Sequence, residues 1–295
     1  MGKILFAGLV ACAMLAEMHA ESPLAWHKEG APASYVELRS GSQPVLRYNY
    51  GVQLPAGVPQ DRARCCYIYP LWTPGGVSPL DDFPKDHYHH RGLFWAWPDV
   101  RVGGVSYDGW LMHGLRTVNK SFHTTLREGG HVAVLDVENE WVVNGKTIVK
   151  AREQYTIHAS KDHSRTLDAA LTLTATTEPV TLRGSHEDTK SYGGLSLRFA
   201  PRENTVLRTE KGLLAKDDDL NAHEWAELEA VYNGHKAAVR VDNDPANDGG
   251  APQWCLRQYG FIGAAFPGKT AQRDTFTLQP GKPLTLRYTV TAADR

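Results

Sequence analysis

The sequence has little cysteine, no large excess of either charge and no apolar run long enough to cross a bilayer. Its 295 residues include 4 cysteines, and 32 basic side chains balance 33 acidic ones to leave a net charge of −1. A disulfide-rich scaffold is therefore excluded, and no broad basic field is available for nucleic acid or an anionic membrane. The longest apolar run, residues 4–16, has 13 residues, whereas a spanning helix needs roughly 20. We expect no nucleic-acid partner and no transmembrane segment.

Several well-known catalytic and nucleotide-binding motifs are missing as well. The sequence contains no Gly-x-x-x-x-Gly-Lys-Ser/Thr loop, Gly-x-Gly-x-x-Gly turn, Gly-x-Ser-x-Gly elbow or His-Glu-x-x-His helix. These absences argue against kinases, nicotinamide-dependent dehydrogenases, α/β-hydrolases and zincins. Helical patterns that alternate with strands are also absent, which argues against a parallel α/β sheet or a TIM barrel.

The N-terminus has the order of segments that is typical of an export signal. Lys3 precedes the apolar run, and a small residue, Ala20, provides a cleavage position. We expect a signal peptide over residues 1–20 and a single β-sandwich domain over residues 21–295. The short stretch that ends in Cys12 leaves a lipoprotein as the less favoured alternative. Both interpretations predict a periplasmic or extracellular protein.

The clearest pattern in the sequence is an alternation with a period of two. Apolar and polar side chains alternate along 147–158, 165–176 and 284–291, as expected for strands with one buried face. Asn-Gly pairs at 144–145 and 233–234 favour tight hairpin turns. The pattern predicts an all-β protein built as a large antiparallel β-sandwich of the supersandwich kind.

Two stretches show where strands and loops are expected to lie. Residues 116–177 are divided by turn signals into a four-stranded antiparallel meander. Residues 51–115 are rich in proline, glycine, histidine and aromatic residues, so this stretch cannot be mostly sheet interior. Long ordered loops on a rigid sheet framework commonly carry functional sites. We therefore look for the site in this irregular stretch.

The densest group of reactive side chains lies there, in residues 86–91, which read Asp-His-Tyr-His-His-Arg. In an extended segment His87 and His89 project to one side and His90 to the other, so an acid–base pair or a two-histidine metal site is available. Asp86 could fix the tautomer of a neighbouring imidazole. Structural histidines that are hydrogen-bonded within a loop are the alternative.

Other residues could complete a site of this kind. Arg91 could stabilise a developing oxyanion, and Glu187 is a second acid–base candidate. If His87 and His89 hold a divalent metal, a carboxylate or another histidine has to supply the third ligand, and the sequence does not locate it. A divalent metal is the only cofactor that the spacing suggests.

Tryptophan and polar loop residues suggest a carbohydrate ligand. Indole rings stack on sugar rings while nearby polar groups bind hydroxyls, so we expect Trp97 and Trp254 as stacking walls and Asp244 and Asn247 as polar contacts. Tryptophans in strands are more often core residues, and this alternative stays open.

Several segments carry a resemblance to a known family. Residues 67–76, with Tyr-Ile-Tyr-Pro-Leu-Trp-Thr-Pro-Gly-Gly, and residues 83–97, which contain the histidine cluster, resemble the signature of uncharacterised secreted bacterial proteins catalogued as "methane oxygenase PmoA". Residues 193–198, 244–247 and 252–261 resemble later blocks of that family in the same order. Ala265 departs from the family pattern, in which an asparagine is common at this place.

The resemblance implies a secreted β-sandwich akin to the galactose-mutarotase-like supersandwiches. Genes of this type often lie beside sugar oxidoreductases and glycan-degrading enzymes, which implies a carbohydrate partner. We therefore expect an exported carbohydrate-active protein, most simply an epimerase, lyase or hydrolase that uses histidine acid–base chemistry on a sugar or keto sugar. The alternatives are a non-catalytic glycan-binding module and the metal-dependent oxygenase that the catalogued name suggests.

Overall fold

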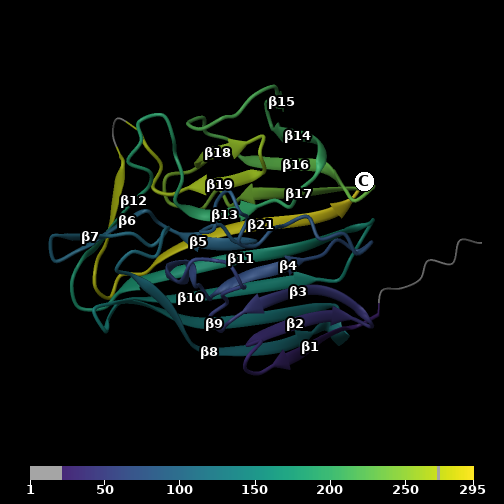
Figure 1. Ribbon diagram of the computed structural model, residues 1–295, viewed down its shortest axis with the longest axis horizontal. Coiled ribbons are helices and arrows are strands. Elements are labelled where there is room, and N and C mark those ends of the chain that lie inside the picture. Colours follow the sequence, from purple (N-terminus) through teal and green to yellow (C-terminus); the bar gives the residue numbers. More distant parts are fainter. Residues whose placement is uncertain (1–21, 271–272) are drawn as a thin grey trace, which may run out of the picture.

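The computed structural model describes residues 22–270 and 273–295, and it consists almost entirely of antiparallel strands (Figure 1). Two 3-10 turns, η1 (Gln60–Arg62) and η2 (Glu128–Gly130), interrupt them. The all-β prediction is confirmed. The expected signal peptide lies outside the described residues. Within the described ranges, no helix has both the length and the apolar character needed to cross a membrane.

Three sheets make up the fold, and the two large ones overlap in the view of Figure 1. The first has the order β15 (Gly212–Leu214), β14 (Glu203–Thr209), β16 (Trp225–Tyr232), β17 (His235–Asn243), β21 (Leu284–Asp294), β11 (Ser164–Ala175), β10 (Lys146–His158), β9 (Val132–Val143) and β8 (Arg116–Arg127). The second has the order β1 (Leu24–Glu29), β2 (Tyr35–Ser40), β3 (Gln43–Asn49), β4 (Tyr67–Leu71), β5 (Leu93–Ala96), β13 (Gly194–Arg198), β19 (Phe261–Ala265) and β18 (Gln253–Arg257). The third has the order β20 (Thr275–Leu278), β12 (Val180–Arg183), β6 (Asp99–Val102) and β7 (Val105–Tyr107).

The alternating pattern of the sequence explains the nine-stranded sheet. The apolar side chains of β10 and β11 are buried, and their polar neighbours lie on the other face. The predicted meander over residues 116–177 is confirmed as the neighbouring strands β8, β9, β10 and β11. Asn144 and Asn233 have φ angles of 48° and 50°, as a hairpin turn of this type requires.

The main core lies between the two large sheets. Leu38 and Leu46 of the eight-stranded sheet and Leu135 and Val149 of the nine-stranded sheet belong to one cluster of buried apolar residues. Contacts of this kind remove apolar surface from water, which is the main favourable contribution to folding.

A second, smaller apolar cluster covers the outer face of the eight-stranded sheet. Successive side chains of a strand point to opposite faces, so Trp95 of β5 joins the main core while Phe94 and Ala96 join the outer cluster. Cys255 and Phe261, from β18 and β19, belong to the same outer cluster. This face is covered by the loops between strands, and the candidate site lies among those loops.

Candidate functional site

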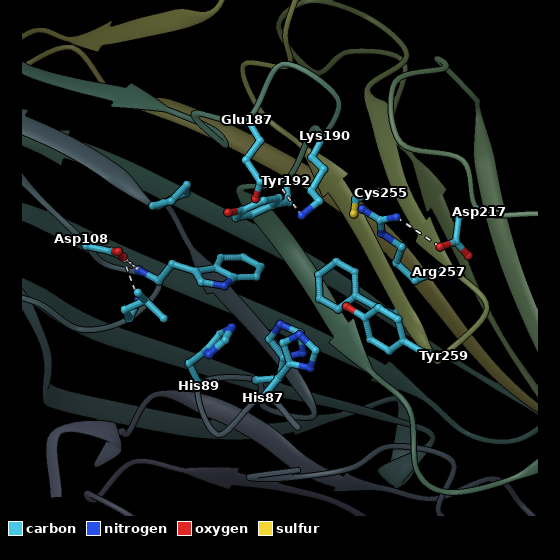
Figure 2. A pocket seen from close by; sticks show the side chains of 15 residues that line it. His87, His89, Asp108, Glu187, Lys190, Tyr192, Asp217, Cys255, Arg257 and Tyr259 are labelled. Atoms are coloured by element: carbon cyan, nitrogen blue, oxygen red, sulfur yellow. Dashed lines mark hydrogen bonds and ion pairs between the residues drawn. The ribbon is translucent and has the colours of Figure 1, made fainter. Parts of the chain in front are cut away.

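A pocket of about 480 Å³ lies over the outer apolar cluster (Figure 2). Its lining residues come from the histidine segment, from the loop after β7, from the loop before β13 and from the hairpin of β18 and β19. His87, His89, His90 and Glu187 all line it. The structure therefore brings four of the residues selected from the sequence into one cavity.

Four aromatic rings form a continuous stack along one side of this pocket. The His87 ring lies between Tyr259 and His90, with centroid distances of 5.3 and 4.7 Å and interplanar angles of 5° in both cases. His90 in turn stacks on Phe261 at 4.9 Å. Burial, followed by the charges of neighbouring groups, holds the pKa of His90 well below its usual value. His90 is therefore a neutral wall residue with both ring faces covered.

The edge of His87 contacts a charged pair behind the pocket. Nδ1 of His87 lies 3.0 Å from Oδ2 of Asp86, and Nη2 of Arg198 donates to both oxygens of that carboxylate at 2.9 and 2.8 Å. Burial raises the pKa of Asp86, but the contacts with His87 and Arg198 outweigh it and the net pKa is lowered. The 3.0 Å contact meets an ion-pair distance but not hydrogen-bond geometry. The negative charge of Asp86 still favours a proton on Nδ1, which leaves Nε2 as the nitrogen that can exchange protons with a ligand.

His89 differs from His87 in its surroundings. Burial lowers the pKa of His89 to about 3, and the positive charges of Arg62, Arg64 and Arg91 act in the same direction. Its ring lies 5.5 Å from that of His87 and at 77° to it. A neutral imidazole of this kind is a weak base, and it can donate or accept a hydrogen bond to a ligand oxygen.

The opposite wall combines aromatic and charged groups, as Figure 2 shows. Nζ of Lys190 lies 2.7 Å from the carboxylate of Glu187, and the ring of Tyr192 lies 4.9 Å from that of Trp110. Trp110 is buried, whereas Tyr259 across the pocket is 43% exposed. Tyr192 and Tyr259 thus offer aromatic surface to a ligand; Trp110 packs against Tyr192, and His87 against Tyr259.

Two further contacts fix the walls in place. Oδ1 of Asp108 accepts hydrogen bonds from the backbone N–H groups of Trp110 and Leu111, both at 2.7 Å. Nη1 of Arg257 lies 3.2 Å from Asp217 and 2.9 Å from Asp219, so its charge is already compensated. The structure therefore presents a preorganised cavity.

Comparison with known proteins shows the family to which this sequence belongs. The family model described as a family of unknown function, DUF6807, matches residues 35–295. The chain belongs to the DUF6807 family. No curated protein matches it. A crystal structure described as a GalM/aldose epimerase homologue from C. elegans is similar over 92% of this chain and 99% of that chain, with 7% sequence identity and a TM-score of 0.37.

Arg91 has a different role in this DUF6807 chain from the one expected. It is fully buried and does not line the pocket. Its guanidinium donates to the backbone carbonyls of Tyr88, His90 and Arg62, and its Nε lies 3.6 Å from Asp82. These donors hold the histidine segment in its folded path, so no donor faces a substrate oxyanion.

Trp97 and Trp254 are core residues and not stacking walls. Their side chains are 1% and 0% exposed, and their indole N–H groups donate at 2.7 Å to the backbone carbonyls of Phe266 and His223. Both belong to the main core because the side chains alternate along their strands, which directs their neighbours Ala96 and Cys255 to the outer face. The alternative interpretation from the sequence, that these tryptophans are core residues, therefore describes the structure.

Asp244 and Asn247 lie away from the histidine pocket, in the loop after β17. Asn247 donates to Oδ1 of Asn243 and to the backbone carbonyl of Arg287, and it lines a separate, smaller cavity of about 160 Å³. Oδ1 of Asp244 accepts from the backbone N–H of Ala246. Both side chains stabilise the loop, so the structure does not bring them to a sugar bound beside His87.

The geometry also bears on the two-histidine metal hypothesis. Within residues 22–270 and 273–295, no group of three or more His, Cys, Asp and Glu side chains is arranged to hold a metal ion. The rings of His87 and His89, the pair expected to bind the metal, lie 5.5 Å apart at 77° to each other, and one face of His87 is stacked on Tyr259. The third ligand that the sequence could not locate is therefore not found in the described chain, and no metal site is proposed.

Sequence reasoning missed several residues of the pocket: Lys190, Tyr192, Asp108, Arg257 and Tyr259. Tyr259 lies in residues 252–261, one of the segments that carry the family resemblance. Of the missed residues it was the easiest to find from the sequence, because Tyr259-Gly260-Phe261 is a turn flanked by aromatic residues. Gly260 has a φ angle of +104°, a backbone conformation that other residues rarely adopt, so glycine is favoured in this turn.

Proposed function

We propose that this chain is a carbohydrate-active enzyme whose pocket binds a sugar of one or two rings and transfers protons through His87. The observation that carries the proposal is the convergence of three imidazoles and Glu187 in one cavity of about 480 Å³. Cavities of roughly 300–1,000 Å³ are typical of small-molecule sites. Similarity to a distant solved structure adds no support of its own.

Each polar residue has a distinct part in the proposed chemistry. His87 gives or takes a proton at Nε2, and Asp86 favours the imidazolium form that arises when the proton is taken. Neutral His89 forms a hydrogen bond to a hydroxyl or carbonyl oxygen of the sugar. Glu187, which is exposed and paired with Lys190, is the second acid–base group on the opposite wall.

The chemistry of the walls favours a sugar over an apolar ligand. Tyr192 and Tyr259 offer partly exposed ring surface to the C–H face of a pyranose. The remaining wall contains hydrogen-bonding groups suited to hydroxyls, and Arg257 is compensated by two carboxylates. Epimerisation, elimination and hydrolysis all require general acid–base catalysis, so the proposal covers the type of catalysis that these three share.

The test is a product screen with matched variants. Wild-type protein and His87→Ala are incubated with oligosaccharides and their oxidised keto forms, and products are followed by chromatography and NMR. We expect turnover by the wild type and a loss of about 10²- to 10⁴-fold in the variant, with an unchanged far-UV CD spectrum. Binding of a glycan by both proteins without any product overturns the enzymatic proposal in favour of a glycan-binding module.

A further inference from the structure

We propose that Arg198 is a positioning residue that holds the His87 ring in its working orientation through Asp86 and Tyr259. The inference rests on the proposed function of His87, and its test requires neither a substrate nor turnover.

Arg198 is well placed for this role because it ends strand β13 on the outer face of the eight-stranded sheet. Leu195 and Leu197 of that strand belong to the main core, so the side chain of Arg198 points to the pocket side. Its Nη2 donates to both oxygens of Asp86, at 2.9 and 2.8 Å. Its Cζ lies 4.8 Å from the centroid of the Tyr259 ring.

The remaining donors of Arg198 show that stability alone does not explain its position. Nε and Nη1 are buried, and neither has a hydrogen-bond partner among the described residues. Buried donors that stay unpaired cost free energy. A guanidinium that bears this cost while contacting Asp86 and Tyr259 serves the site more than the fold.

Both contacts of Arg198 lead to the same imidazole. Through Asp86, Arg198 reaches the Nδ1 edge of His87, at 3.0 Å. Through Tyr259, it reaches one face of the ring, which is parallel to Tyr259 within 5°. His90 covers the other face. The ring is thus fixed on two faces and one edge, and its Nε2 edge is left for a ligand.

The groups around His87 make the role of Arg198 specific. His89 and His90, from its own segment, are neutral because burial lowers their pKa. Tyr259, from the turn between β18 and β19, is uncharged because burial raises the pKa of its hydroxyl. The charged group next to the ring is therefore Asp86, and Arg198 from β13 is the cation that binds it.

More distant charges contribute less. Arg257, from β18, is compensated by Asp217 and Asp219. On the opposite wall, Lys190 and Glu187 neutralise each other at 2.7 Å. Asp81 lies near Arg198 in the segment before the histidines, and burial raises its pKa. None of these groups takes the place of Arg198 beside Asp86.

The experiment is an NMR measurement of the His87 Cε1–H resonance, assigned by its loss in His87→Gln. In the wild type we expect an upfield ring-current shift and NOEs to the Tyr259 ring, because the two rings stack at 5.3 Å. Arg198→Met should lose most of this shift and of these NOEs, since Asp86 and Tyr259 both lose the contact that holds them, and Asp86→Asn should weaken both signals in the same direction. Arg198→Lys retains a charge beside Asp86 and should restore the signals in part. Arg152→Met is the matched control, because it removes an exposed arginine that lies 2.7 Å from Asp136 on the other large sheet.

The outcomes separate this inference from the proposed function. An unmoved His87 resonance with unchanged NOEs in Arg198→Met overturns the positioning role whether or not the protein turns over a sugar. A lost ring-current shift and lost NOEs without any turnover sustain the positioning role while the proposed function fails. If Arg198→Met does not fold, Arg198→Lys and Asp86→Asn carry the test, and wild-type signals in both variants overturn the role.

Discussion

His87 stacks face to face on His90, with ring centroids 4.7 Å apart and planes within 5° of parallel. The two histidines come from the same short segment of the sequence, but they have separate roles in the structure. His90 is enclosed between His87 and Phe261, while His87 keeps one edge towards the pocket. Substitutions at the two positions therefore test which histidine only forms the pocket wall and which one transfers protons.

His90→Phe should retain activity, because phenylalanine keeps a flat ring in the stack and removes only nitrogens that do not act. We expect kcat/KM within about threefold of the wild type, against a loss of about 10²- to 10⁴-fold for His87→Phe. Steady-state kinetics on the substrate found in the product screen measure both. Equal losses in the two variants would contradict the assignment of His90 as a wall.

Tyr192→Ala should weaken sugar binding, since it removes aromatic surface from the wall opposite the histidines. The expected increase in Kd is about tenfold, equivalent to roughly 1.4 kcal/mol of aromatic contact. Isothermal titration calorimetry with the bound sugar measures it. Tyr107→Ala, which removes a half-buried tyrosine that does not line the pocket, is the control. Unchanged affinity in Tyr192→Ala would remove this side chain from the site.

Trp97→Ala should lower the free energy of unfolding, because Trp97 is a core residue. The side chain is buried, packs against Trp141 at 5.5 Å and hydrogen-bonds to the Phe266 carbonyl. Large-to-small changes at such positions cost about 3–5 kcal/mol. Urea denaturation measures the change in free energy of unfolding. A variant of full stability that no longer binds sugar would restore the stacking role expected from the sequence.

Glu153 should make stability depend on pH. Burial raises its pKa to about 7, although hydrogen bonds from Tyr155, Asn139 and Tyr48 act in the opposite direction. Since the folded pKa lies above the ordinary value of 4.5, the contribution of this group is fully present below about pH 4.5 and is lost as pH rises through about 7.

The measurement is urea denaturation of the wild type and Glu153→Gln at about pH 4.5 and pH 8.5. The wild type should lose up to about 3 kcal/mol more than the variant between these values, because only the wild type ionises at this position. At low pH the two proteins should differ little, because glutamine resembles the protonated acid and its Oε1 can accept the hydrogen bond that the Asn139 side-chain N–H donates to Glu153. Parallel pH curves would show that Glu153 does not titrate in this range.

The fold was predictable because its signals are local. Alternation along 165–176 and the Asn-Gly pair at 144–145 specify strands and turns through neighbouring residues alone. The histidine cluster was found for the same reason, since residues 86–91 are contiguous.

The rest of the site depends on which face of a strand a residue occupies. Trp97 and Trp254 were assigned to the ligand, yet both point into the main core. Both faces of β5 are apolar, so its sequence does not reveal which face the loops will cover. Tyr259 contacts His87, and Arg198 contacts Asp86 beside it, only after β13, β18 and β19 have paired. No spacing in the sequence predicts these contacts.

The two-sided burial of β5 has a consequence for how this protein can change. Phe94 under the pocket and Trp95 in the main core are neighbours on one short strand, so the floor of the cavity cannot be reshaped without disturbing the interior of the sandwich. Variation in ligand preference is therefore expected in the loop that carries Glu187 and Lys190, where replacements meet solvent. Directed evolution for a new ligand should randomise the positions around Glu187 in that loop, keep Glu187 itself, and leave the strand untouched.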